Sequence, residues 1–114
     1  VFPDSLRAFL EDPRMLKTGV NVSGDAGRLN REFSLKTAGL VELGTNARYV
    51  LPELESIARP TLARLTSHLL NRSLDKGPVR TSNWERMQLS PEQKEYAATD
   101  AYVSYKLYRM LEAR

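Results

Sequence analysis

The pattern of hydrophobic and polar positions predicts short elements in the first half of the chain and longer helices in the second. "FPDSLRAFLED", residues 2–12, is expected to form an amphipathic helix with Leu6, Phe9 and Leu10 turned inward, and Pro13 sets its end. "MLKTGVNV", residues 15–22, is short, rich in branched side chains and nearly uncharged, which is typical of a buried strand.

A helix and a second strand follow, so the front of the chain predicts a β-α-β unit. Residues 23–25 are expected to turn, residues 26–33 to form a helix and residues 39–43 to form a strand. The strands of such a unit run parallel and are joined by a right-handed crossover. Two strands rarely make a stable sheet, and parallel strands need both faces covered. We therefore expect an α/β fold whose remaining strands lie outside this chain.

The second half is predicted to be helical from Leu51 onward. Residues 60–71 place their leucines in helical register, and a loop is expected at residues 75–86 because glycine and proline interrupt the pattern there. The last helix has the clearest start, at "SPEQ", residues 90–93. Its serine suits the N-cap, its proline suits the first helical position, and its glutamine completes a capping box.

The apolar stripe of this last helix contains an aspartate. The stripe comprises Tyr96, Asp100, Val103, Leu107 and Leu111. A buried carboxylate is costly unless it is paired or binds a metal, so two explanations of Asp100 are open: a bond inside the protein, or a metal site. Tyr96, one turn earlier, is a core aromatic in the first case and a partner in the site in the second.

Composition narrows the chemistry. The chain has 114 residues, no cysteine and one histidine, which excludes disulfides and a zinc site built from Cys and His. A metal would need oxygen ligands, which favours Mg²⁺ or Mn²⁺. No run approaches the roughly 18 apolar residues of a membrane span. Residues 58–114 carry ten Lys and Arg against six Asp and Glu, which suits phosphate contacts or an ordinary solvated surface.

Two stretches resemble a known family. "KTGVNVSGDAGRL", residues 17–29, and "VRTSNWERMQLSPEQKEYAATDAYVSYKLYRML", residues 79–111, are similar to 3′–5′ exonuclease domains of the DnaQ-like (DEDDy) superfamily, in the Werner syndrome exonuclease-like branch. The resemblance implies a partial RNase H-like α/β fold, with short parallel strands covered by helices. It also implies that residues 1–114 form the C-terminal portion of such a domain.

The resemblance assigns expected roles to individual residues. Asp25 corresponds to the second-motif aspartate that supports metal binding, and Asp100 to the third-motif metal ligand. Tyr96 corresponds to the tyrosine that orients the attacking water. Arg80 is expected to contact a phosphate, and Trp84 either to stack on a base or to anchor the last helix. The cofactor implied is a pair of Mg²⁺ or Mn²⁺ ions.

The family's first motif, Asp-x-Glu, is absent. The nearest similar stretch, "ELE" at residues 53–55, starts with the wrong acid and lies after Asp25. The two-metal site is therefore expected to be incomplete, and the missing N-terminal part to lie upstream in the parent protein or in a partner chain. The expected function is metal-dependent hydrolysis of DNA or RNA from the 3′ end, without a membrane partner. The alternative is a catalytically degenerate module of the same fold that binds nucleic acid or serves in protein assembly.

Overall fold

The computed structural model describes residues 2–57, 59–74 and 77–113. Asp75 and Lys76, at the start of the predicted loop, lie outside the described residues. The elements in chain order are α1 (Asp4–Glu11), β1 (Lys17–Gly19), α2 (Val22–Phe33), β2 (Leu40–Glu42), α3 (Leu43–Val50), the short 3-10 helix η1 (Pro52–Leu54), α4 (Leu62–Leu70), a second 3-10 helix η2 (Pro78–Thr81) and α5 (Pro91–Glu112).

The predicted β-α-β unit is confirmed. Strands β1 and β2 pair in parallel, with Lys17 opposite Leu40 and Gly19 opposite Glu42, and α2 connects them. Both strands are shorter than the sequence pattern predicts: two residues separate the end of β1 from α2, and α3 begins directly after β2. The prediction of a turn at residues 23–25 is wrong, since these residues form the first turn of α2. The helix α3, which follows β2 without a break, was not expected.

One side chain explains where both helices begin. The Glu42 carboxylate accepts hydrogen bonds from the backbone N–H groups of Asn21 at 2.9 Å and Val22 at 3.0 Å, at the start of α2. It also accepts from the N–H of Gly44 at 3.3 Å, in the first turn of α3. Unpaired N–H groups at a helix start favour an acceptor with negative charge. The Glu42 carboxylate therefore caps the starts of both α2 and α3.

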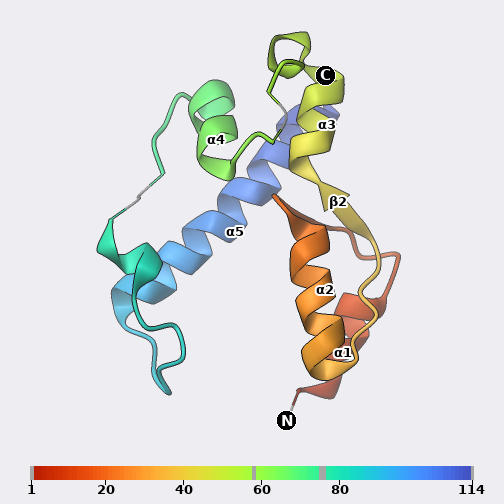
Figure 1. Cartoon of the computed structure of the whole chain (residues 1–114), viewed down its shortest axis with the longest axis vertical. Helices are drawn as coiled ribbons and strands as arrows, with labels where there is room; N and C mark the ends of the chain where they lie inside the picture. Colours follow the sequence, from red (N-terminus) through yellow and green to blue (C-terminus); the bar gives the residue numbers. More distant parts are fainter. Residues whose placement is uncertain (1, 58, 75–76, 114) are drawn as a thin grey trace.

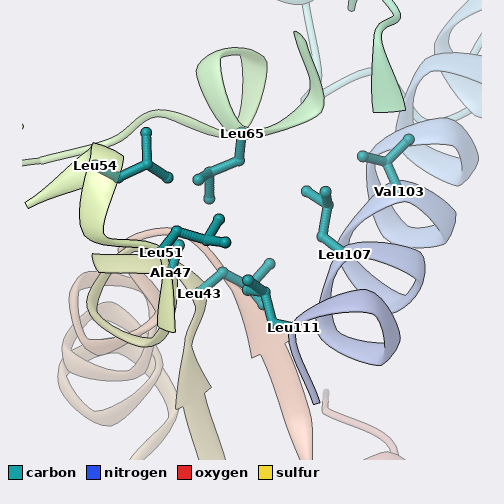
Figure 2. Packing of buried hydrophobic residues seen from close by; sticks show 8 residues of the cluster. All are labelled: Leu43, Ala47, Leu51, Leu54, Leu65, Val103, Leu107 and Leu111. Carbon is teal, nitrogen blue, oxygen red and sulfur yellow. The ribbon is translucent and has the colours of Figure 1, made fainter. Parts of the chain in front are cut away.

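The hydrophobic core lies in the second part of the chain. Eight buried residues form it: Leu43, Ala47, Leu51, Leu54, Leu65, Val103, Leu107 and Leu111. Four parts of the chain contribute these residues: α3, α4, α5, and the short segment around η1. Figure 2 shows the α5 side chains turned toward those of the other elements. The predicted apolar stripe of α5 is therefore confirmed at Val103, Leu107 and Leu111.

The first part of the chain is packed differently. No residue of α1 or α2 is buried, and the inward placement predicted for Leu6 and Phe9 is wrong, since they are 43% and 41% exposed. In Figure 1 these helices lie on one side of α5, away from α4. The radius of gyration is 15.2 Å, whereas a compact chain of this length would have about 13 Å. The molecule is thus more open than a self-contained domain. No helix within the described ranges combines the length and the apolar character needed to cross a membrane.

Candidate active site

The start of α5 fixes the register of the candidate site. Ser90 Oγ accepts from the N–H of Gln93 at 3.1 Å, and Gln93 Oε1 accepts from the N–H of Ser90 at 2.9 Å. With Pro91 at the first helical position, this is the capping box that the sequence predicts. Tyr96 and Asp100 consequently lie one helical turn apart on the same side of α5.

Tyr96 and Asp100 line two adjoining hollows. The first, of about 220 Å³, is also lined by Glu92, Glu95 and Thr99 from α5 and by Leu74 and Val79. The second, of about 210 Å³, is lined in addition by Arg80, by Leu74 and by residues 61–63 at the start of α4. The two side chains therefore share one location, which Glu92 and Glu95 also line in the first hollow and Arg80 in the second.

Asp100 is half-buried, and burial raises the pKa of its carboxyl group. Within the described residues its carboxylate takes part in no ion pair or hydrogen bond, although Arg80 lines the same hollow. In the described part of the chain, every buried side-chain oxygen has a hydrogen-bond partner. Since the Asp100 carboxylate has none, its oxygen atoms must reach solvent. The described residues therefore do not provide the compensating bond inside the protein that was the first explanation of Asp100. Its carboxylate is open to a cation entering the hollow.

Trp84 packs against Tyr96. The ring centroids lie 5.9 Å apart at an angle of 51°, and the indole Nε1–H donates to the backbone oxygen of Arg80 at 3.0 Å. The ring is still 36% exposed. This geometry favours Trp84 as a packing anchor for α5 and leaves part of the indole surface available to a ligand.

Gln93 is a site residue whose second role the sequence reasoning missed. It is 2% exposed, and its Nε2 group donates to Ser82 Oγ at 2.9 Å and to the backbone oxygen of Asn83 at 3.0 Å. The sequence indicates only the capping bonds at residues 90–93. The number of hydrogen-bond donors on the side chain could have indicated this second role. A capping glutamine uses its oxygen and keeps two N–H donors, which need partners when the residue is buried.

Asp25 is separate from this arrangement. It is exposed in the first turn of α2, where its charge favours the helix start, and it does not line the hollows of Tyr96 and Asp100. A further hollow of about 510 Å³ lies at the carboxyl ends of β1 and β2, lined by Asn21, Glu42 and Arg59 among others. Thr61 lines both this hollow and one of the Asp100 hollows, so the two adjoin.

The described residues do not make a metal centre by themselves. They contain no group of three His, Asp or Glu side chains placed to hold an ion. Glu53 begins the "ELE" stretch in η1 and contacts His68, with 3.1 Å between Oε1 and Nε2. This stretch is therefore not on a strand, unlike the missing Asp-x-Glu motif. Asp100 can supply one carboxylate ligand to an oxygen-bound cation, and the remaining ligands would have to come from elsewhere.

Comparison with known proteins identifies the class. The family model described as 3′–5′ exonuclease matches residues 3–114. The bifunctional 3′–5′ exonuclease/ATP-dependent helicase WRN of Mus musculus is 38% identical over 112 residues, which cover 97% of this chain and 8% of that protein. A 3′–5′ exonuclease of Arabidopsis thaliana is 34% identical over 96% of this chain and 37% of its own length. The chain belongs to the 3′–5′ exonuclease family.

Solved structures agree with this assignment. A structure described as the apo form of a nuclease matches 99% of this chain and 53% of its own chain, with a TM-score of 0.83 and 26% identity. Brucella melitensis NrnC bound to pGG matches with a TM-score of 0.80 and 25% identity, over 99% of this chain and 52% of its own. The expected α/β, RNase H-like exonuclease fold is thereby confirmed. The chain spans about half the length of these nucleases and less of the curated relatives.

Proposed function

We propose that this chain is the C-terminal portion of a divalent-metal-dependent 3′–5′ exonuclease domain that hydrolyses nucleic acid from its 3′ end. The observation that carries the proposal is the pair Tyr96 and Asp100, one helical turn apart and lining the same hollows. The Asp100 carboxylate has no protein partner within the described residues. In this proposal Asp100 and Asp25 are metal ligands, and Tyr96 holds the attacking water by its hydroxyl group.

The proposed cofactor is Mg²⁺ or Mn²⁺. Carboxylate oxygens are the ligands that these ions prefer, and a bound divalent ion would lower the pKa of a coordinated water and neutralise developing charge at the scissile phosphate. Since one or two carboxylates are too few for such a site, an Asp-x-Glu strand is required as well. We place it beside the short sheet of β1 and β2, either elsewhere in the same protein or in a partner chain. The solved nucleases, about twice as long as the matched part, support this division.

Arg80 and Trp84 are the proposed contacts to nucleic acid. Arg80 lines one of the Asp100 hollows, where its guanidinium group would bind a phosphate, and the exposed part of the Trp84 ring would stack on a base.

Degradation of a 5′-labelled single-stranded oligonucleotide tests the proposal. We expect this chain alone to bind the oligonucleotide without shortening it. A longer protein that includes the Asp-x-Glu strand should produce a ladder that shortens from the 3′ end with manganese. The ladder should disappear with a chelator and in Asp100→Asn. A ladder that Asp100→Asn leaves unchanged would exclude Asp100 from the reaction.

A binding module without catalysis is the second candidate function. The observation in its favour is that the described residues hold no cluster of three potential metal-binding side chains. It predicts that the longer protein binds the oligonucleotide and yields no ladder with either Mg²⁺ or Mn²⁺. Asp100→Asn should then leave the affinity for the oligonucleotide unchanged or improve it slightly, because a negative charge is removed.

A further inference from the structure

The loop before α5 is held by one buried side chain. Gln93 is 2% exposed, and both ends of its amide are used. Oε1 accepts from the N–H of Ser90 within the capping box. Nε2 donates to Ser82 Oγ and to the Asn83 backbone oxygen, so one residue of α5 is bonded to two consecutive residues of the loop.

This loop carries the two proposed nucleic-acid contacts. Arg80 lies in η2, two residues before Ser82, and Trp84 directly follows Asn83. The indole N–H of Trp84 donates back to the Arg80 oxygen, which closes the loop on itself. The Trp84 ring then meets the Tyr96 ring at 5.9 Å. A continuous chain of contacts therefore leads from the Gln93 amide to the side chain of Tyr96.

The bonds from Gln93 to the loop are separate from its bond in the helix cap. Its Oε1 serves the helix cap and its Nε2 serves the loop, so the two tasks belong to different atoms of one group. A buried donor that loses its acceptor destabilises the folded state, and so does a buried acceptor that loses its donor. The loop bonds are therefore strong enough to select one loop position.

We propose that Gln93 is a positioning residue, whose side-chain amide seats the Arg80–Trp84 loop so that Trp84 braces Tyr96 and Arg80 lines the hollow of Asp100. The residue does not touch the substrate in this proposal. It acts through Ser82, Asn83 and Trp84. The nucleic-acid part of the proposal rests on the proposed function, whereas the loop-holding part is independent of it.

Gln93→Glu separates the two tasks of the side chain. The carboxylate keeps an oxygen for the Ser90 N–H and suits the positive helix start, but it removes both donors to the loop. Ser90→Ala is the matched control, because it weakens the helix cap and leaves the Gln93 Nε2 bonds in place. Ser82→Ala is a milder second variant that removes one of the two acceptors and introduces no charge.

Trp84 provides the measurement, since it is the single tryptophan of the chain. In Gln93→Glu we expect its emission to shift to the red and its quenching by acrylamide to rise about twofold, as the indole leaves Tyr96. Affinity for a single-stranded oligonucleotide should fall roughly fivefold, the equivalent of one hydrogen bond worth about 1 kcal/mol. Ser82→Ala should change both in the same direction by less. Ser90→Ala should lower the melting temperature and leave quenching and affinity unchanged.

The outcomes distinguish this inference from the proposed function. If Gln93→Glu and Ser82→Ala both remain folded by circular dichroism and their tryptophan quenching equals that of the native chain, Gln93 does not seat the loop. If Ser90→Ala raises quenching as much as Gln93→Glu does, only the helix cap matters and the inference is wrong. If the native chain fails to bind the oligonucleotide, the nucleic-acid role fails, while the quenching results still decide the loop-holding role.

Discussion

The part of the chain before α3 and the part from α3 onward have similar hydrophobic side chains and bury them to very different extents. All eight members of the core cluster lie between Leu43 and Leu111. In the described residues before α3, Leu35 is the buried hydrophobic residue, while Met15, Leu16 and Leu40 are 47%, 54% and 39% exposed. The difference indicates that the second part has its own core, and that the first part presents apolar surface which further structure would cover.

The candidate site is divided along the same line. Tyr96 and Asp100 lie on α5, which carries three core residues, whereas Asp25 lies on α2, which buries none. Side chains on well-packed elements keep their positions, and those on loosely packed elements need outside support. Tyr96 and Asp100 therefore lie on an element that is packed within this chain, whereas Asp25, the other proposed metal ligand, lies on a helix without a buried residue.

The largest effect that would sharpen this comparison is expected at Leu107. It is fully buried in the core, so Leu107→Ala should lower the free energy of unfolding by about 2–5 kcal/mol. Leu16→Ala is the matched variant in the first part, and it should cost less than about 0.5 kcal/mol because the side chain is exposed. Urea denaturation followed by circular dichroism measures both. Equal losses in the two variants would mean that the two parts are not packed differently.

A smaller effect is expected at Glu42, which joins the two parts. Glu42→Ala leaves the N–H groups of Asn21, Val22 and Gly44 without their acceptor, and should cost about 1–2 kcal/mol. Glu42→Gln, which keeps one neutral oxygen, should cost less. Hydrogen exchange at these three amides should accelerate in the order native, Glu42→Gln, Glu42→Ala. Unchanged exchange in Glu42→Ala would show that the carboxylate does not hold the two helix starts. Glu32→Ala, an exposed change on α2, is the control.

How much of the structure the sequence predicts depends on how far apart along the chain the interacting residues are. The start of α5 is correctly predicted because its cap lies within residues 90–93. The start of α2 and the existence of α3 are not, because Glu42 acts on Asn21 and Val22 from 21 and 20 positions away. The exposed positions of Leu6 and Phe9 were mispredicted for a related reason: the periodicity indicates an apolar face and not whether a partner covers it.

The site follows the same rule. The spacing of Tyr96 and Asp100 is a local property of one helix, so the sequence indicates that they share a face. The bonds from Gln93 to Ser82 and Asn83 span 11 and 10 positions, across a loop whose course no local pattern predicts. The relation of Asp25 to Asp100 depends on how two separately packed parts meet. Family resemblance can suggest such a relation, and residue periodicity cannot.

The smallest predicted effect is on stability at Asp100, where a substitution is expected to stabilise the folded chain rather than destabilise it. Burial raises the pKa of this carboxyl group in the folded chain, so the folded state binds the proton more tightly than the unfolded state. Stability from this group is therefore present at low pH and lost as pH rises from about 4, the unfolded value, through the raised folded value. Asp100→Asn removes that loss. Because solvent reaches the carboxylate, the gain at pH 7 should stay below about 1 kcal/mol, or about 1–3 °C in melting temperature.

Melting curves from pH 3 to pH 7 measure this effect, with Asp25→Asn as the matched variant in the first part of the chain. Asp100→Asn should match the native chain at pH 3 and exceed it at pH 7. Asp25→Asn should be slightly less stable than the native chain at pH 7, since it removes a charge that favours the start of α2. If Asp100→Asn melts lower than the native chain at pH 7, the carboxylate has a stabilising partner within the protein, and its availability to a metal ion would be refuted.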